Sequence, residues 1–147
     1  MNNENIIYTF KTVDNDYIIE FIKKEKSLFI TSYEFTCIIN FKNIYGTILK
    51  SISLNNIELS KLLDNLQMYL VLDQSIYFHI YSPDGFGNDH YLIGLSTECN
   101  EKNSYWKNIF TLYGYHNESI VKILSFDISG NLDELIDKIY NICNSQK

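Results

Sequence analysis

Arginine and alanine are absent from the 147 residues, and proline occurs only once. Without arginine, the chain has no planar guanidinium group to hold phosphate or carboxylate through paired hydrogen bonds. The 12 basic side chains are all lysines and face 18 acidic ones, which gives a formal net charge of −6. A chain with this charge repels polyanions, so we expect neither nucleic acid nor a membrane surface as a partner.

Long apolar segments and paired cysteines are also missing. The longest stretches without a charged residue are ten residues long, 74–83 and 108–117, whereas a transmembrane helix needs about 18 or more. The N-terminal residues Met-Asn-Asn-Glu-Asn lack the basic and apolar regions of a secretory signal. Cys37, Cys99 and Cys143 form no CxxC motif. We therefore expect reduced thiols, with Cys99 the exposed one, in a cytoplasmic protein without a cofactor.

The remaining composition is sufficient for one folded domain over residues 1–147. Hydrophobic residues make up 46% of the chain and aromatic residues 15%, which supports a core and excludes disorder. No Ser/Gly-rich or Pro-rich segment divides the chain. Alternation of apolar and polar residues predicts eight strands, which lie near residues 6–10, 17–21, 33–42, 44–54, 75–82, 91–98, 108–116 and 119–128. Between them, 14–16 and the lysine-rich 23–26 read as turns, and Gly46 as a bulge.

Two amphipathic helices interrupt the strands, at about 57–72 and 131–143. The first follows a capping pair, Asn55 and Glu58, and the second begins near Asn131. Their apolar stripes are Leu59, Leu62, Leu63, Leu66 and Leu70, and Leu132, Leu135, Ile136, Ile139, Ile142 and Cys143. We expect an α+β fold, with both helices packed on a mostly antiparallel sheet of seven or eight strands. Each half ends with a long strand and an Asn-capped helix, as a diverged duplication would.

Signatures of catalysis are absent, because no P-loop, dinucleotide-binding, nucleophile-elbow, HExxH or EF-hand motif occurs. The best catalytic candidate is the loop 83–90, which contains Asp84, Asp89 and His90 and follows His79. Two carboxylates and two imidazoles could hold a metal or perform acid–base chemistry. The same residues fit an ordinary hairpin loop, since Pro83-Asp84-Gly85 is common turn chemistry. We favour the loop interpretation and predict no catalytic residue and no metal ligand.

The surface chemistry of residues 73–118 is more informative. This segment holds six acidic residues and two lysines, a net charge of −4, together with the only tryptophan. Tyrosine and tryptophan are enriched at protein interfaces, and nearby carboxylates would attract a basic partner. The alternative is that the tyrosines line a second core layer and the acidic residues only aid solubility. The predicted partner-binding residues are Tyr77, His79, Tyr81, Asp84, Asp89, Glu98, Glu101, Tyr105, Trp106, Tyr113 and Tyr115.

In size, acidity, lack of arginine and helix–sheet mixture, the whole chain resembles the cytosolic immunity proteins of bacterial toxin systems, including contact-dependent inhibition and other polymorphic toxins. The resemblance implies stoichiometric inhibition of a cognate toxin with a basic surface. Two alternatives remain open. One is a small-molecule-binding or phage counter-defence domain with a pocket at the Gly-Phe-Gly loop. The other is a metal-dependent hydrolase that uses His79, Asp84, Asp89 and His90.

Overall fold

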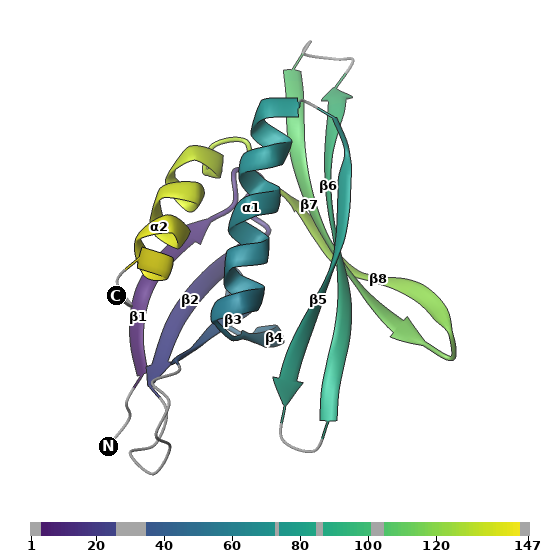
Figure 1. Ribbon diagram of the computed structural model, residues 1–147. Helices are drawn as coiled ribbons and strands as arrows, with labels where there is room; N and C mark the ends of the chain where they lie inside the picture. The colour runs from purple at the N-terminus through teal and green to yellow at the C-terminus, as the bar shows by residue number, and fades with distance from the viewer. Residues whose placement is uncertain (1–3, 26–34, 73, 85–86, 101–104, 145–147) are drawn as a thin grey trace.

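The computed structural model describes residues 4–25, 35–72, 74–84, 87–100 and 105–144. Figure 1 shows two groups of strands with two helices packed against them. The elements are β1 (Glu4–Lys11), β2 (Tyr17–Glu25), β3 (Phe35–Asn43), β4 (Ile48–Leu54), α1 (Asn56–Leu72), β5 (Ile76–Asp84), β6 (Gly87–Asn100), β7 (Tyr105–His116), β8 (Ser119–Asp127) and α2 (Leu132–Asn144).

The strands form two four-stranded antiparallel sheets, each ordered as in the chain: β1-β2-β3-β4 and β5-β6-β7-β8. The predicted α+β class is confirmed, but two sheets replace the expected single one, since β4 and β5 form no ladder with each other. These two strands still contact each other, and the Ser53 backbone N–H donates to Ser82 Oγ at 2.8 Å. Each half has the order ββββα, so the repeat in the sequence pattern is also present in the topology. Neither described helix combines the length and apolar character needed to cross a membrane.

Helix α1 begins where the sequence predicts, because the Asn55 side chain caps it by accepting the Glu58 backbone N–H at 2.9 Å. Its predicted stripe is buried except at Leu70, which is exposed. Tyr69 is buried instead, and its hydroxyl bonds to Thr97 Oγ1 at 2.8 Å and Asn108 Oδ1 at 2.6 Å. In α2, four residues of the predicted stripe are buried: Leu132, Leu135, Ile139 and Ile142.

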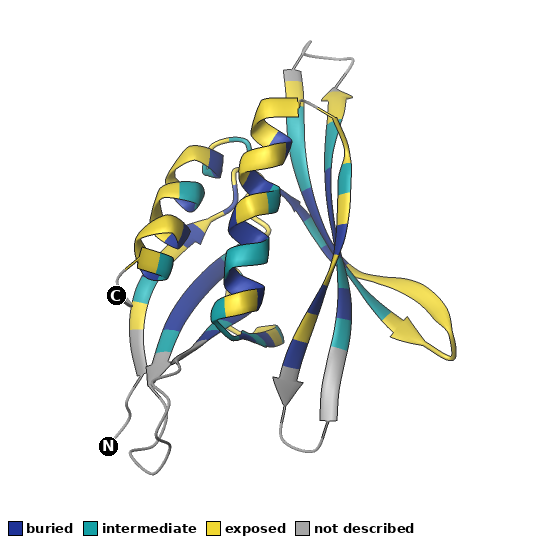
Figure 2. Cartoon of the chain, viewed as in Figure 1, coloured by how far each residue is buried: buried dark blue, intermediate teal, exposed yellow. Residues whose placement is uncertain are grey.

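A continuous hydrophobic core joins the two sheets and the helices. Phe41 of β3 lies with its ring centroid 6.1 Å from those of Phe110 and Phe126 in the second sheet. Helix α1 lies between the two sheets, and α2 covers the first sheet near β1 and β2 (Figure 1). The far end of the β7–β8 hairpin projects beyond the helices and is exposed (Figure 2).

Local geometry departs from the predictions in the first sheet. A register shift between Ile6 and Tyr8 turns Ile6 away from the core and leaves it exposed. Gly46 is in the β3–β4 turn with φ of 88°, a conformation that favours glycine, and not in a bulge. Of the predicted turn 23–26, residues 23–25 continue β2, since Lys23 and Lys24 pair with Cys37 and Thr36. Residue 26 lies outside the described part of the chain.

Candidate functional site

Strand β5 presents aromatic side chains on the face of the second sheet that points away from the core. Phe78 and Ile80 are buried among core residues, whereas the alternate residues Tyr77 and Tyr81 are 58% and 46% exposed. Successive side chains of a strand point to opposite faces, which explains this separation. On β7, Tyr115 shares the outward phase and is 40% exposed. These tyrosines therefore do not form a second core layer, the alternative interpretation of the sequence.

Three rings stack in a row across strands β5, β6 and β7. Tyr81 pairs with His90 in the β5–β6 ladder, and their ring centroids are 4.6 Å apart at an interplanar angle of 8°. On its other side, His90 stacks with Tyr115 at 4.9 Å and 22°. We call the outward-phase residues Tyr77, His79, Tyr81, His90, Tyr113 and Tyr115 the aromatic face.

His79 fixes the end of this row. Its Nδ1 lies 3.2 Å from the Tyr115 hydroxyl, within hydrogen-bond distance. The His79 ring also lies 4.7 Å from the His90 ring, tilted by 40°. Side chains that come from three strands are thereby held in one arrangement. Each loses less conformational freedom when a partner binds than a free side chain would.

The other end of the aromatic face depends on a glycine. Gly94 pairs with Tyr77 on β5 and Thr111 on β7. A Cβ atom at Gly94 would lie 2.8 Å from Tyr77 Cε1 and 3.3 Å from Tyr113 Cε2. The absence of a side chain thus lets the Tyr77 ring lie over the strand next to Tyr113. A glycine in a strand interior commonly marks such a close approach.

The imidazole of His90 is held in its neutral form. Its pKa lies below the ordinary value, chiefly because of burial and then because of the nearby charges of His79 and Lys61; Glu58 acts in the opposite direction. Within the described part of the chain, His90 Nε2 is buried without a hydrogen-bond partner. Protonation would place a charge on this unpartnered atom, which disfavours the imidazolium form. At neutral pH the centre of the row is therefore an uncharged ring.

Helix α1 holds the edge of β5 that carries these residues. Glu58 Oε2 accepts the Tyr81 backbone N–H at 3.1 Å, and Lys61 Nζ donates to the His79 carbonyl at 3.0 Å. The two side chains also pair with each other at 3.4 Å. Glu58 therefore does not complete the predicted capping box with Asn55. Instead, the two charged groups satisfy an exposed sheet edge, which otherwise invites pairing with another chain.

Five of the predicted partner-binding residues lie together on the aromatic face: Tyr77, His79, Tyr81, Tyr113 and Tyr115. Glu98 shares the outward phase and is exposed, but it lies eight residues along β6 from His90, about 27 Å away. Trp106 is in phase with the core residues Phe110 and Leu112 and therefore lies on the opposite face of the sheet. The structure therefore does not bring Trp106 and Glu98 together with the tyrosines.

The acidic part of the predicted surface falls mostly outside the described residues. Glu101 lies outside them entirely, as do the side chains of Asp84, Asp89 and Tyr105. The backbone corrects the predicted loop 83–90, because β5 continues to Asp84 and β6 begins at Gly87. Asp89 pairs with Ser82 in this ladder, directly beside the Tyr81–His90 pair.

The described residues contain no group of three or more His, Cys, Asp or Glu side chains placed to hold a metal ion. His79 and His90 do lie together, but the side chains of Asp84 and Asp89 that would complete the predicted set are not described. The thiols are free, with Cys37 buried, Cys99 exposed and Cys143 intermediate. Burial raises the pKa of Cys37 to about 12, with a smaller contribution from Cys143. Cys37 therefore remains protonated and unreactive in the folded protein.

His90 is the residue that the sequence interpretation left out of the partner-binding set. The Gly-Asn-Asp sequence before it predicts a loop, so the sequence places His90 only in the candidate metal-binding or catalytic set. Only the β5–β6 register, which pairs it with Tyr81, reveals its place in the row.

Comparisons with protein-family models, curated proteins and solved structures give no match to this chain. Its function must therefore be inferred from the site geometry.

Proposed function

We propose that this protein is a non-catalytic inhibitor that binds a cognate toxin through the aromatic face, as an immunity protein. The observation that carries the proposal is the stacked row of Tyr81, His90 and Tyr115, which lies on a sheet surface instead of in the core. Monomeric proteins bury such rings or scatter them singly. A contiguous, partly exposed cluster of large rings is typical of an interaction surface.

The aromatic face has the properties of a binding hot spot. Tyrosine buries a large area while its hydroxyl keeps a polar contact, and it is among the residues that dominate interface energies. The hydrogen bond between Tyr115 and His79 and the contacts of β5 with α1 fix the rings before a partner arrives. Neutral His90 adds no charge that would have to be desolvated.

Electrostatics favours a basic partner. The chain carries a net charge of −6, and residues 73–118 account for −4 of it. In the backbone register Asp84 and Asp89 share the phase of Ser82 and Tyr91, not that of Tyr81 and His90, so the attraction is assigned to the net charge of the segment. Carboxylates at the rim of an interface raise the association rate with a cationic protein more than they raise the final affinity. This charge distribution suits a toxin that carries lysine and arginine around its active site.

A genetic and biochemical experiment tests the function. The gene adjacent to this one should encode a secreted protein with a toxic C-terminal domain. Expression of that domain should arrest growth, and co-expression of this chain should restore growth and yield a 1:1 complex on size-exclusion chromatography. Growth arrest without rescue, or rescue without a complex, would contradict stoichiometric inhibition. The absence of a toxin gene beside this one would also count against the immunity role.

Single tyrosine variants test whether the aromatic face is the toxin-binding surface, independently of whether the protein is an inhibitor. The Tyr81→Ala and Tyr115→Ala variants should lose rescue at low expression. Tyr45→Ala is the matched control, because Tyr45 is 87% exposed in the β3–β4 turn of the other sheet. If the complex forms and neither Tyr81→Ala nor Tyr115→Ala weakens it, inhibition holds but the aromatic face is not the interface.

A further inference from the structure

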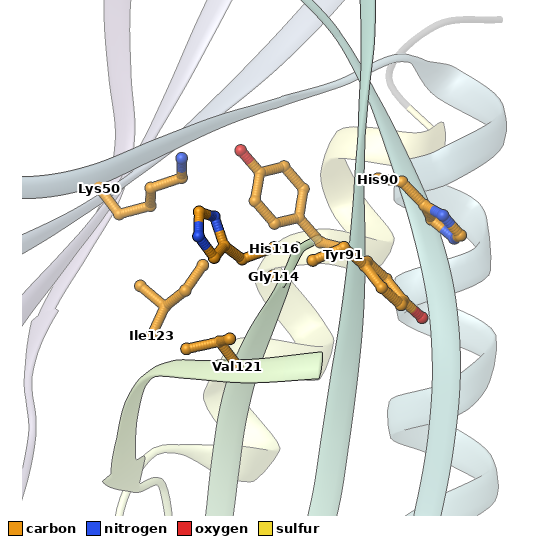
Figure 3. Close-up of a pocket in the computed structure, with 8 residues that line it drawn as sticks. Lys50, His90, Tyr91, Gly114, His116, Val121 and Ile123 are labelled. Carbon is orange, nitrogen blue, oxygen red and sulfur yellow. The ribbon is translucent and has the colours of Figure 1, made fainter. Parts of the chain in front are cut away.

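A groove lies on the other side of the strands that carry the aromatic face. It has a volume of about 530 Å³ and is bordered by β4, β6, β7 and β8, with these lining residues: Lys50, His90, Tyr91, Gly114, Tyr115, His116, Val121 and Ile123. Figure 3 shows Lys50, Tyr91 and His116 around the hollow with Val121 and Ile123 below them. His90 is directed to the opposite side of its strand. His90 and Tyr115 thus border both the groove and the aromatic face, whereas Lys50, Tyr91, His116, Val121 and Ile123 line the groove alone.

Irregular pairing of β7 with β8 creates the apolar side of the groove. Leu112 pairs with Leu124, but the next residue of β7, Tyr113, pairs with Lys122. Ile123 is therefore left without a partner in the ladder, as the extra residue of a bulge. The Ile123 side chain crosses β7 at Gly114, where an added Cβ would lie only 3.0 Å from Ile123 Cδ1. This end of the hairpin projects past α1 (Figure 1), so the helix does not fill the hollow.

Lys50 supplies a positive charge at this apolar surface. Its side chain is half-buried, and Nζ lies 5.0 Å from the centroid of the Tyr91 ring. Within the described residues, no carboxylate comes within 4.0 Å of Lys50 Nζ, whereas Lys42 pairs with Glu20 at 2.9 Å and Lys61 with Glu58 at 3.4 Å. None of the eight lining residues is acidic. Lys50 therefore keeps an ammonium group that no described carboxylate pairs with, at the border of an apolar hollow.

We infer that this groove binds a small organic anion, a carboxylate attached to an apolar chain or ring. The carboxylate would lie at Lys50 Nζ, where the His116 imidazole can act as a further hydrogen-bond donor, and the apolar part would lie against Val121 and Ile123. The volume is within the range of small-ligand sites, about 300–1,000 Å³. Lysine acts as a single point charge and no arginine is present, which favours one carboxylate over a phosphate group.

Titration with hexanoate, followed by ¹⁵N–¹H NMR, tests this inference, with hexanamide, hexylamine and inorganic phosphate as comparison probes. Hexanoate should shift the amide signals of Gly114, Val121 and Ile123. Hexanamide, which keeps the shape without the charge, should bind about tenfold more weakly or worse. Hexylamine and phosphate should not shift these signals. No shift with hexanoate, or equal binding of hexanamide, would overturn the inference.

Two variants test whether hexanoate binds at the groove or responds only to the net charge of the protein. Lys50→Met should weaken hexanoate binding about tenfold or more, while Lys11→Met should leave it within about twofold. Lys11 is exposed in β1, which two strands separate from β4, and its substitution changes the net charge equally. If Lys50→Met unfolds the chain, Val121→Glu provides a second variant. Val121 is exposed, so the fold tolerates a carboxylate there. That carboxylate would pair with Lys50 and block the site. Unchanged hexanoate binding in a folded variant of either kind would contradict the inference.

Discussion

Tyr81 and His90 face each other across the β5–β6 ladder with their rings 4.6 Å apart and almost parallel, at 8°. Neighbours in a ladder commonly interact through their side chains, but here the pair is extended by Tyr115 on a third strand. The result is a row of stacked rings on the surface of an acidic protein, with Lys61 Nζ 5.6 Å from the centroid of the Tyr81 ring. Its position outside the core is the basis of the proposed toxin-binding role.

Substitution of Gly94 by alanine should disturb this surface more than it disturbs the fold. The new methyl group would lie 2.8 Å from the Tyr77 ring, and exposed Tyr77 can swing outward. We expect toxin affinity to fall about tenfold, by analogy with the loss of a hot-spot residue, and the free energy of unfolding to change by less than about 1 kcal/mol. Calorimetric titration and urea unfolding measure the two quantities.

A double-mutant cycle identifies the cause of that loss. If Gly94→Ala acts by displacing Tyr77, it should cause no further loss of affinity in a Tyr77→Ala background. Additive losses would show that Gly94 affects binding by another route.

The β7–β8 turn offers a stabilising substitution. Asn117 and Glu118 occupy the two turn positions with φ of 49° and 67°. Asparagine tolerates this left-handed region, but glutamate is strained there by about 1–2 kcal/mol. Glu118→Gly should therefore raise the free energy of unfolding by about 1 kcal/mol, after allowance for the greater freedom of glycine in the unfolded chain. Urea unfolding should show a smaller gain for Asn117→Gly, and an equal gain would contradict the strain argument.

Glu20 should make stability depend on acid pH. Burial opposes its ionisation, but hydrogen bonds from Lys42 and Asn40, together with the Lys42 charge, outweigh burial and lower its pKa below the usual 4.5. The bonds are 2.9 Å from Lys42 Nζ and 3.1 Å from Asn40 Nδ2. A lowered pKa in the folded state means that the stabilisation is present at neutral pH and is lost as the pH falls below about 4.5.

The Glu20→Gln variant measures this contribution. At pH 7 we expect it to lower the free energy of unfolding by about 1–3 kcal/mol, because it leaves Lys42 half-buried without its partner. Between pH 7 and pH 3 the difference from the unsubstituted protein should shrink. Glu98→Gln, at an exposed carboxylate, should cost less than about 1 kcal/mol. A constant deficit for Glu20→Gln across this pH range would refute the assignment.

Alternation along single strands predicted much of the site, because a period of two separates Tyr77, His79 and Tyr81 from Phe78 and Ile80 without any tertiary information. The same rule excludes Trp106 from the aromatic face, because Trp106 lies seven positions before Tyr113 and an odd separation puts the two side chains on opposite faces.

Other features depend on contacts between distant segments. Helical spacing alone allowed either Leu70 or Tyr69 to face the core, and the partners Thr97 and Asn108 of the Tyr69 hydroxyl decide the outcome. His90 joins the row only through the β5–β6 register. The local pattern places α1 between β4 and β5, but it does not specify whether these two strands pair with each other, and the structure keeps them in separate sheets.

The most direct test of the account is the affinity of the purified toxin domain for three single tyrosine variants, measured by isothermal titration calorimetry. If the aromatic face is the binding surface, Tyr81→Ala and Tyr115→Ala should each raise Kd about tenfold or more. Tyr45→Ala, the exposed control in the other sheet, should leave Kd unchanged. Equal Kd values for all three variants and the unsubstituted protein would contradict the central claim.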